Sequence, residues 1–170
     1  MPDKIEFGMI HIGFFDIPVC KHDTTRISVN GTIEFKGSAH FGRSSKVYIR
    51  KGAKMVLGNN FEVSSASSFD CMKHIEIGED VLFAWDCLVM DYDGHAIFDE
   101  NGVRINNEKP VVIGNHTWVG CRSTILKGTV IPDNCVIGAG TTLSGQQFVP
   151  NSIIVGNPPK SRKKIGGWVL

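Results

Sequence analysis

Leucine and alanine are scarce in this chain of 170 residues, which contains only 6 of each. Isoleucine and valine instead number 18 and 16, and glycine contributes 19 residues. Leu and Ala favour helices, whereas the β-branched side chains of Ile and Val suit the surface of a sheet. The composition therefore excludes a helical bundle and favours a strand-rich protein with many tight turns. The length is that of one domain, or two at most.

Long apolar runs and an excess of one charge are also absent. The densest apolar stretch, residues 81–85, is far shorter than the roughly 20 residues that a membrane helix needs. Charged residues precede the first apolar run, which makes a poor secretory signal. A net charge of +1 gives no overall field toward nucleic acid or an anionic membrane. We therefore expect a cytoplasmic protein with no membrane span and no nucleic-acid partner.

Paired cysteines are missing as well. The chain has five cysteines, an odd number, and no two of them form a C-x-x-C pair. This pattern fits neither a disulfide framework nor a zinc knuckle. Reduced thiols in the cytoplasm are the simplest interpretation.

What the sequence does contain is a period of six residues. Inward-type aliphatic residues recur at Ile113, Val119, Ile125, Ile131, Ile137 and Leu143. Small residues follow four positions after the first five, at Thr117, Ser123, Thr129, Cys135 and Thr141. Neither a helix nor a plain alternating strand produces a strict period of six, but a chain that turns a corner every six residues does. Three such faces make a coil of about 18 residues, and stacked coils form a parallel β-helix.

The period also divides the chain into segments. It continues upstream with slips, so the solenoid is expected to span 31–155. Residues 1–30 alternate like strands without the six-residue step, and we expect them to cap one end of the solenoid. Residues 156–170 form a basic tail. The interval 91–110 interrupts the coil, and a long insertion in a regular solenoid is more often functional than accidental.

Three motifs resemble a known family. GNHTWVG at 114–120, VIGAG at 136–140 and VGNPPK at 155–160 are similar to the hexapeptide-repeat acyltransferases. The nearest branch is the sugar O-acetyltransferases, which include galactoside, maltose and polysaccharide-modifying enzymes. The resemblance implies a left-handed parallel β-helix with a protruding loop at about 91–110. It also implies a homotrimer with active sites between subunits, acetyl-CoA as donor and a hydroxyl as acceptor. Nucleotidyltransferases and γ-class carbonic anhydrases share the solenoid.

His95 is the leading catalytic candidate. It stands in an Asp-Gly-His context similar to that of the family's catalytic histidine. A hydroxyl is a poor nucleophile at neutral pH, and imidazole is suited to accept its proton. We hypothesise direct attack on the thioester without an acyl-enzyme. The alternative is an ordinary solvated loop histidine.

Acidic and aromatic residues surround this loop in the sequence. Asp91 and Asp93 flank it, and either could orient His95 or contact a sugar. Both could equally be turn residues that cap backbone amides. Asp86 and Trp85, on the coil just before the loop, are candidates for lining the acceptor site.

The resemblance also implies a binding surface for acetyl-CoA. The backbone N–H of Cys121 matches the position that bonds the thioester oxygen and could stabilise an oxyanion. The other positions that match the family's contacts to the donor are Trp118, Gly120, Gly138, Ala139, Lys160 and Lys163. Lysines there suit phosphates, although a charge run is usually a solvated surface. The family's Thr-Lys pair reads Ser144-Gly145, so one cationic contact is lost.

The acceptor and metal patterns depart from known enzymes. The asparagine and aspartate that hold a galactoside fall on Ser64 and Met72, so a polysaccharide or glycan-precursor sugar is the more plausible acceptor. His74, His95 and His116 lack the close pair that a carbonic-anhydrase site needs, and no metal is expected. An amino-sugar N-acetyltransferase and a non-catalytic glycan-binding or assembly module are the alternative functions.

Overall fold

The computed structural model describes residue 2, residues 4–14 and residues 23–169. Within these residues the chain forms strands joined by short turns and contains no helix, so none that could span a membrane. Part of the expected cap, residues 15–22 with Cys20, lies outside the described residues. The strand-rich class predicted from the excess of Ile and Val is confirmed.

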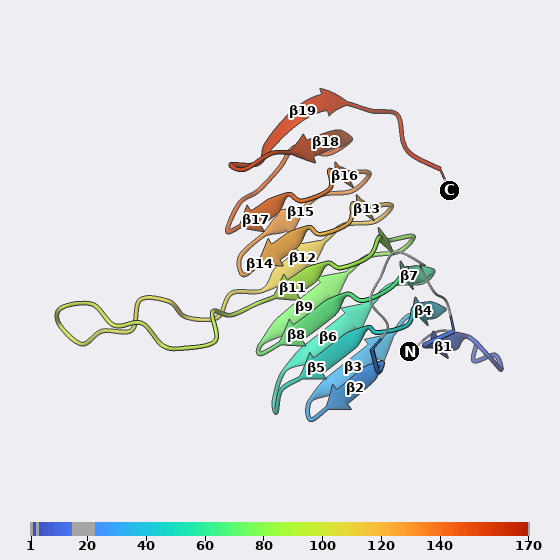
Figure 1. Ribbon diagram of the computed structural model, residues 1–170, viewed down its shortest axis with the longest axis horizontal. Helices are drawn as coiled ribbons and strands as arrows, with labels where there is room; N and C mark the ends of the chain where they lie inside the picture. The colour runs from blue at the N-terminus through green and yellow to red at the C-terminus, as the bar shows by residue number, and fades with distance from the viewer. Residues whose placement is uncertain (1, 3, 15–22, 170) are drawn as a thin grey trace.

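The strands stack into three sheets that wrap around one core (Figure 1). Sheet A contains β1 (Ile10–Ile12), β4 (Ala39–Phe41), β7 (Phe61–Val63), β10 (Leu82–Phe83), β13 (Trp118–Val119), β16 (Val136–Ile137), β18 (Ser152–Val155) and β19 (Lys160–Lys164). Sheet B contains β2 (Arg26–Val29), β5 (Lys46–Ile49), β8 (Ser68–Cys71), β11 (Leu88–Met90), β14 (Thr124–Leu126) and β17 (Thr142–Ser144). Sheet C contains β3 (Thr32–Phe35), β6 (Lys54–Leu57), β9 (His74–Ile77), β12 (Val111–Ile113) and β15 (Val130–Ile131). From β1 to β17 successive strands visit the three sheets in turn, which makes the molecule a parallel β-solenoid.

Strand pairing gives the length of each coil. Val112 pairs with Val130 and Thr124 pairs with Thr142, each 18 residues further along the chain. This is the coil length that three six-residue faces predict. Before the insertion the coils are longer, since Thr32 pairs with Lys54, 22 residues on. The extra residues enlarge the turns and account for the slips in the period.

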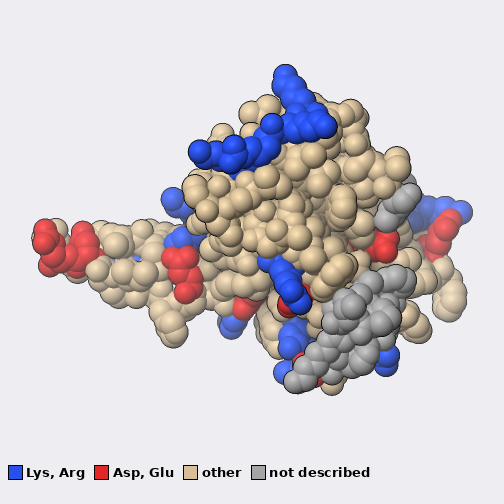
Figure 2. Space-filling view, turned by 45° about the horizontal axis from the view of Figure 1, so that its top comes forward, with Lys and Arg blue, Asp and Glu red and all other residues tan. Residues whose placement is uncertain are grey.

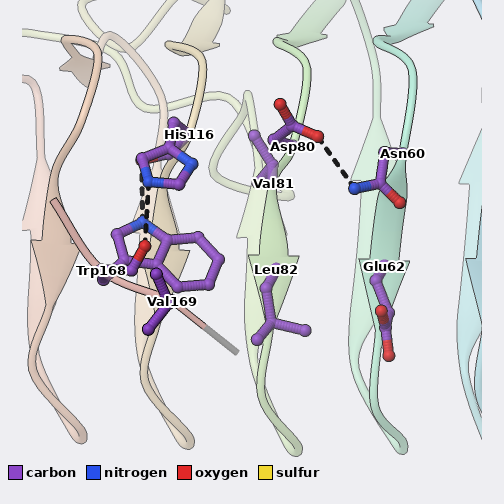
Figure 3. A pocket seen from close by; sticks show the side chains of 8 residues that line it. All are labelled: Asn60, Glu62, Asp80, Val81, Leu82, His116, Trp168 and Val169. Atoms are coloured by element: carbon purple, nitrogen blue, oxygen red, sulfur yellow. Dashed lines mark hydrogen bonds between the residues drawn. The ribbon is translucent and has the colours of Figure 1, made fainter.

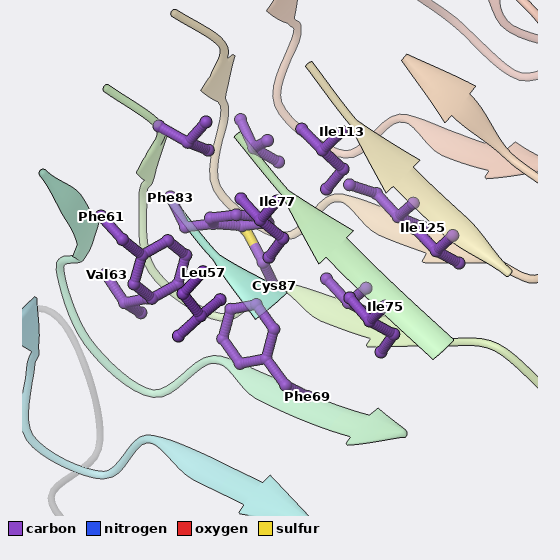
Figure 4. Packing of buried hydrophobic residues seen from close by; sticks show 14 of the residues in the cluster. Leu57, Phe61, Val63, Phe69, Ile75, Ile77, Phe83, Cys87, Ile113 and Ile125 are labelled. Carbon is purple, nitrogen blue, oxygen red and sulfur yellow. The ribbon is translucent and has the colours of Figure 1, made fainter. Parts of the chain in front are cut away.

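The core consists of the residues that the period marks as inward. All six aliphatic residues from Ile113 to Leu143 in the six-step series are at most 1% exposed, as are the five small residues that follow them. Lower down, the rings of Phe61, Phe69 and Phe83 contact one another with centroids 5.1–6.0 Å apart (Figure 4). Cys135 is buried, as its place among the small residues predicts. Cys87 is buried too, and burial raises the pKa of its thiol to about 11.

Three edges separate the sheets: the glycine edge, the loop edge and the asparagine edge. At the glycine edge sheet A passes into sheet B, through Gly120–Arg122 and 138–140. A Cβ on Gly120 would lie 2.7 Å from the backbone N of Ala139, so this close stacking requires glycine. At the loop edge sheet B passes into sheet C, and here the insertion 91–110 leaves the body. At the asparagine edge sheet C passes into sheet A, through Asn60, Asp80, His116 and Asn134.

The last strand closes one end of the solenoid. β19 turns back and pairs with β18 in the antiparallel sense, unlike the other strand pairs of the described residues. Its five residues, KSRKK, are all exposed. Figure 2 shows Lys and Arg side chains gathered over this end of the molecule. The open sheet is thus covered by a charged strand, which discourages pairing with other chains.

Phe83 and Phe98 provide a matched test of the core. Phe83 is 0% exposed and Phe98, on the protruding loop, is 59% exposed. We expect Phe83→Ala to lower the free energy of unfolding by about 3–5 kcal/mol, because it leaves a cavity between packed rings. Phe98→Ala should change it by less than about 0.5 kcal/mol. Urea denaturation of both variants measures the difference, and equal losses would contradict this account of the core.

Candidate active site

The candidate residues lie on two different edges of the solenoid. The loop edge carries Asp91, Asp93, His95 and Ser144. The glycine edge carries Trp85, Asp86, Gly120, Cys121, Gly138 and Ala139. The two edges flank sheet B, whose strands enter at the glycine edge and leave at the loop edge. A three-residue strand alone spans about 10 Å, so one chain holds the two groups apart.

The insertion leaves and rejoins the coil without disturbing its register. Ile75 of β9 pairs with Val111 of β12, which lies 36 residues further on, twice the 18-residue coil. The segment therefore extends away from the body, and the solenoid continues beyond it in the same register (Figure 1). What fixes the loop must be its first residues and the contacts at its base.

Asp91 is completely buried at the start of the loop. Its carboxylate accepts hydrogen bonds from the backbone N–H groups of Met72, Lys73 and His74 at 2.6–2.7 Å. Three amides compensate a buried carboxylate for the water that it loses. Asp91 thus caps the turn of the coil below, which is the structural alternative that the sequence leaves open.

Tyr92 provides the second anchor and is also buried. Its hydroxyl donates to Asp70 Oδ2 at 2.6 Å and accepts from Arg50 Nη2 at 2.8 Å. Arg50 and Asp70 form an ion pair with two hydrogen bonds. Burial, together with the neighbouring Asp70, raises the pKa of the Tyr92 phenol, so it stays protonated as a donor.

Asp93 provides the third anchor through Lys127 and Asn106. Its Oδ2 accepts from Lys127 Nζ at 2.5 Å and from Asn106 Nδ2 at 3.0 Å. Lys127 holds the pKa of Asp93 below its ordinary value, chiefly by this hydrogen bond. Asn106 also donates to the carbonyl oxygen of His95 at 2.8 Å and accepts from the N–H of Ile97 at 2.7 Å. The two sides of the loop are joined at its base.

His95 stands beyond these anchors with its side chain exposed. Within the described residues, no hydrogen bond joins its ring to Asp91 or Asp93. The rest of the loop exposes four large apolar side chains by 51–62%: Ile97, Phe98, Val103 and Ile105. Exposed apolar side chains that form a contiguous patch are common at surfaces that bind another molecule.

The glycine edge presents an unpaired amide beside charged side chains. Gly140 donates to the carbonyl of Cys121, and Gly120 donates to Ile137, but the N–H of Cys121 has no partner among the described residues. Arg122 Nε lies 3.6 Å from the carboxylate of Asp86 on the coil below. A fixed amide donor of this kind can stabilise negative charge on an oxygen.

The other residues that the sequence predicts to bind acetyl-CoA lie on coils above this edge, apart from Ser144. Trp118 lies on the outer face of sheet A and is 40% exposed. Lys160 pairs with Val155 and Lys163 with Ile153, so β19 brings both lysines above the same face. Ser144 ends β17 and lies at the loop edge instead. No group of three metal-binding side chains gathers in the part of the chain that the structure describes.

Sequence reasoning missed the residues that hold the loop and one tail residue. Asn106 and Lys127 carry no motif, and their roles depend on contacts with residues 13 and 34 positions away. The only available signal was that Lys127 occupies the next turn at the interrupted edge. Trp168 looked like part of a tail, yet it stacks on His116 with ring centroids 4.8 Å apart.

Lys127→Met tests whether this network holds the loop. We expect the amides of residues 94–105 to exchange hydrogen about tenfold faster, because charged hydrogen bonds contribute roughly 1.5–3 kcal/mol. Asp93 has a lowered pKa, so its contribution is present above the ordinary value of 3.8 and is lost only as pH falls through the folded value. Protection from pH 5 to 8 should therefore be constant after correction for intrinsic rates.

Lys51→Met is the matched control, since Lys51 is an exposed lysine in a turn of the same edge. It should leave exchange in the loop unchanged. If both variants exchange alike, the Lys127 contacts do not hold the loop.

Comparison with known proteins identifies the repeat and its relatives. The bacterial transferase hexapeptide model (six repeats) matches residues 110–145. Galactoside O-acetyltransferase of Escherichia coli (strain K12) is 31% identical over 122 residues, which cover 70% of this chain and 58% of that protein. Polysialic acid O-acetyltransferase of Neisseria meningitidis is 43% identical over 77 residues, which cover 45% of this chain and 34% of that protein. The chain thus spans less than two thirds of these relatives.

Solved structures give the same relationship. A maltose O-acetyltransferase from Clostridium difficile 630 has a TM-score of 0.59 at 26% identity, covering 85% of this chain and 68% of that one. A galactoside acetyltransferase in complex with coenzyme A shares the fold, with a TM-score of 0.56 at 23% identity over 84% of this chain and 66% of that one. The repeat and these relatives identify the chain as a hexapeptide-repeat protein related to galactoside, maltose and polysialic acid O-acetyltransferases.

Proposed function

We propose that the protein transfers an acetyl group from acetyl-CoA to a hydroxyl of a sugar or polysaccharide precursor. The observation that carries this proposal is His95, exposed on a loop whose base is anchored at three consecutive residues. Relatives named as galactoside, maltose and polysialic acid O-acetyltransferases support the reaction class. A relative solved with coenzyme A supports the donor.

The proposed chemistry needs one base and one oxyanion donor. His95 accepts the proton of the acceptor hydroxyl as its oxygen attacks the thioester carbonyl. The N–H of Cys121 donates to the carbonyl oxygen, which becomes negative in the tetrahedral intermediate. When the carbon–sulfur bond breaks, the imidazolium returns its proton to the departing thiolate, so no charge accumulates. No acyl-enzyme forms in this sequence.

Other residues are proposed to hold the two substrates. Sheet A and the glycine edge beside it carry the groups proposed to bind acetyl-CoA. The unpaired amide of Cys121 suits the thioester, and the exposed ring of Trp118 suits the pantetheine arm. The lysines of β19 suit the phosphates. Trp85 and Asp86 at the glycine edge would line the acceptor site. Asp93 supports His95 indirectly, because it holds Asn106, which bonds the carbonyl of His95.

The separation of the two edges leads to an assembly proposal. His95 and Cys121 flank sheet B in one chain, so a complete site requires the loop edge of one copy and the glycine edge of another. The exposed apolar side chains of the loop would be covered in that contact. We propose a homotrimer with a site between each pair of neighbouring copies, since closed symmetric assemblies repeat one contact.

A thiol-release assay tests the function. Acetyl-CoA is incubated with sugars, nucleotide sugars and oligosaccharides, and free thiol is followed. Acetyl transfer to a hydroxyl acceptor is the expected result. Release only with amino acceptors would overturn the O-acetyltransferase assignment. Absence of thiol release with every acceptor, together with no binding of CoA by calorimetry, would favour a non-catalytic module.

His95→Ala should lower the turnover number by about 10²–10⁴-fold, the usual contribution of a general base. Binding of CoA should persist, because the donor residues lie on the other edge. His40→Ala is the control, since His40 is an exposed histidine on an early coil of sheet A. Near-normal turnover of His95→Ala that still binds CoA would rule out this base.

Mixed assemblies test whether the site lies between copies. His95→Ala disables the loop edge, and Trp118→Ala disables the donor surface. When the two variants are refolded together, about a quarter of the sites should combine one intact half from each, and activity should recover to that level. If each chain carried a complete site, the mixture would be no more active than the variants alone.

A further inference from the structure

A pocket lies on the outer face of sheet A, beside the asparagine edge and away from both groups of candidate catalytic residues (Figure 3). Its volume is about 340 Å³. Leu82 forms an apolar floor beside the buried Val81. Glu62 and Asp80 stand on one side, and Trp168 stands on the other. The proposed acetyl transfer uses none of these residues.

Trp168 is a fixed wall of this pocket and not a loose tail side chain. Its Nε1–H donates to the carbonyl of His116 at 2.9 Å, and His116 Nε2 donates to the carbonyl of Trp168 at 3.1 Å. The two rings are stacked, with planes 13° apart. A wall held by two reciprocal hydrogen bonds and a stacked ring is organised before any ligand arrives.

The opposite wall carries two carboxylates, and the amide of Asn60 beside them donates to one of these. Asp80 Oδ1 accepts from Asn60 Nδ2 at 2.8 Å, and within the described residues neither Asp80 nor Glu62 has a cationic partner. Carboxylates accept hydrogen bonds and repel anions. The pocket therefore suits a group that presents hydroxyl or ammonium donors and disfavours a phosphate or a carboxylate.

We propose that this pocket binds a pyranose ring that carries hydroxyl or amino groups, as one unit of a glycan. A pyranose has an apolar C–H face for the indole and Leu82, and polar substituents at its rim for Glu62 and Asp80. An apolar surface with a few convergent polar groups is the usual composition of a small-molecule site. The inference does not rest on acetyl transfer, because it concerns binding alone.

The pocket borders the proposed surface for coenzyme A but shares no lining residue with it. It lies over β7 and β10, whereas the lysines are on β19. Trp118 stands between, with its ring centroid 6.1 Å from that of Trp168. A glycan unit in the pocket and coenzyme A at the lysines would therefore occupy different coils of the same face. Both should bind together.

Calorimetry with three trisaccharides tests the proposal, without acetyl-CoA. Cellotriose is neutral, the fully deacetylated glucosamine trimer is cationic and the galacturonic acid trimer is anionic. We expect the glucosamine trimer to bind most tightly, cellotriose to bind more weakly and the galacturonic acid trimer to bind least. Saturating coenzyme A should leave these affinities unchanged. Equal or tighter binding of the acidic trimer, or displacement by coenzyme A, would overturn the assignment.

Variants locate the binding. Glu62→Gln keeps the shape of the pocket and should weaken binding of the glucosamine trimer about tenfold, the effect of losing roughly 1.4 kcal/mol. Trp168→Ala should weaken both bound trimers. Glu76→Gln, at an exposed glutamate on sheet C, is the control and should bind as the unaltered protein does. If Glu62→Gln and Trp168→Ala both bind like the control, the pocket is not a glycan site, whatever the outcome of the acetyl-transfer assay.

Discussion

Each face of a coil stacks one inward side chain on the same face of the coil below. The rest of the structure depends on this constraint. From Ile113 to Leu143 every sixth residue is buried, and the small residues between them are buried as well. Close packing leaves no room for a shift of one position, because a single slip would turn the aliphatic side chains outward. The strict coil above the insertion and the wider turns below it both satisfy this rule, and the wider turns do so by placing extra residues outside the core.

The same constraint explains where polar interactions concentrate. In a solenoid with a regular core, a long segment can leave the body at a corner and the chain can then resume its register. Val111 does so beside Ile75. The segment that leaves has no core of its own, so hydrogen bonds must fix its direction. Asp91, Tyr92 and Asp93 each bind a different partner on the body, and those partners carry charge or offer backbone amides. Electrostatics here replaces the packing that the loop lacks.

Much of the fold and part of the candidate site could be predicted from the sequence. The period of six indicated the solenoid, the buried small residues and the limits of the loop, and the resemblance of its Asp-Gly-His context singled out His95. It could not show that the backbone N–H groups of residues 72–74 donate to Asp91, or that Asn106 and Lys127 hold the loop. Those contacts join distant positions that no local pattern connects. Nor could it show Trp168 packed on His116, because residues 165–169 have left the repeat.

The sequence by itself determined the fold class, because a periodic inward face is a local property of the chain that any stacked coil must satisfy. Tertiary structure alone decided which candidates share an edge. It separated His95 from Cys121 by the width of sheet B and placed Lys160 above the glycine edge, through the reversal of β19 on β18. The physical reason is that the position of a corner in space depends on the number of residues in every preceding turn. A repeat pattern with slips and one long insertion specifies which residues face inward, whereas only the folded coils show which corners coincide.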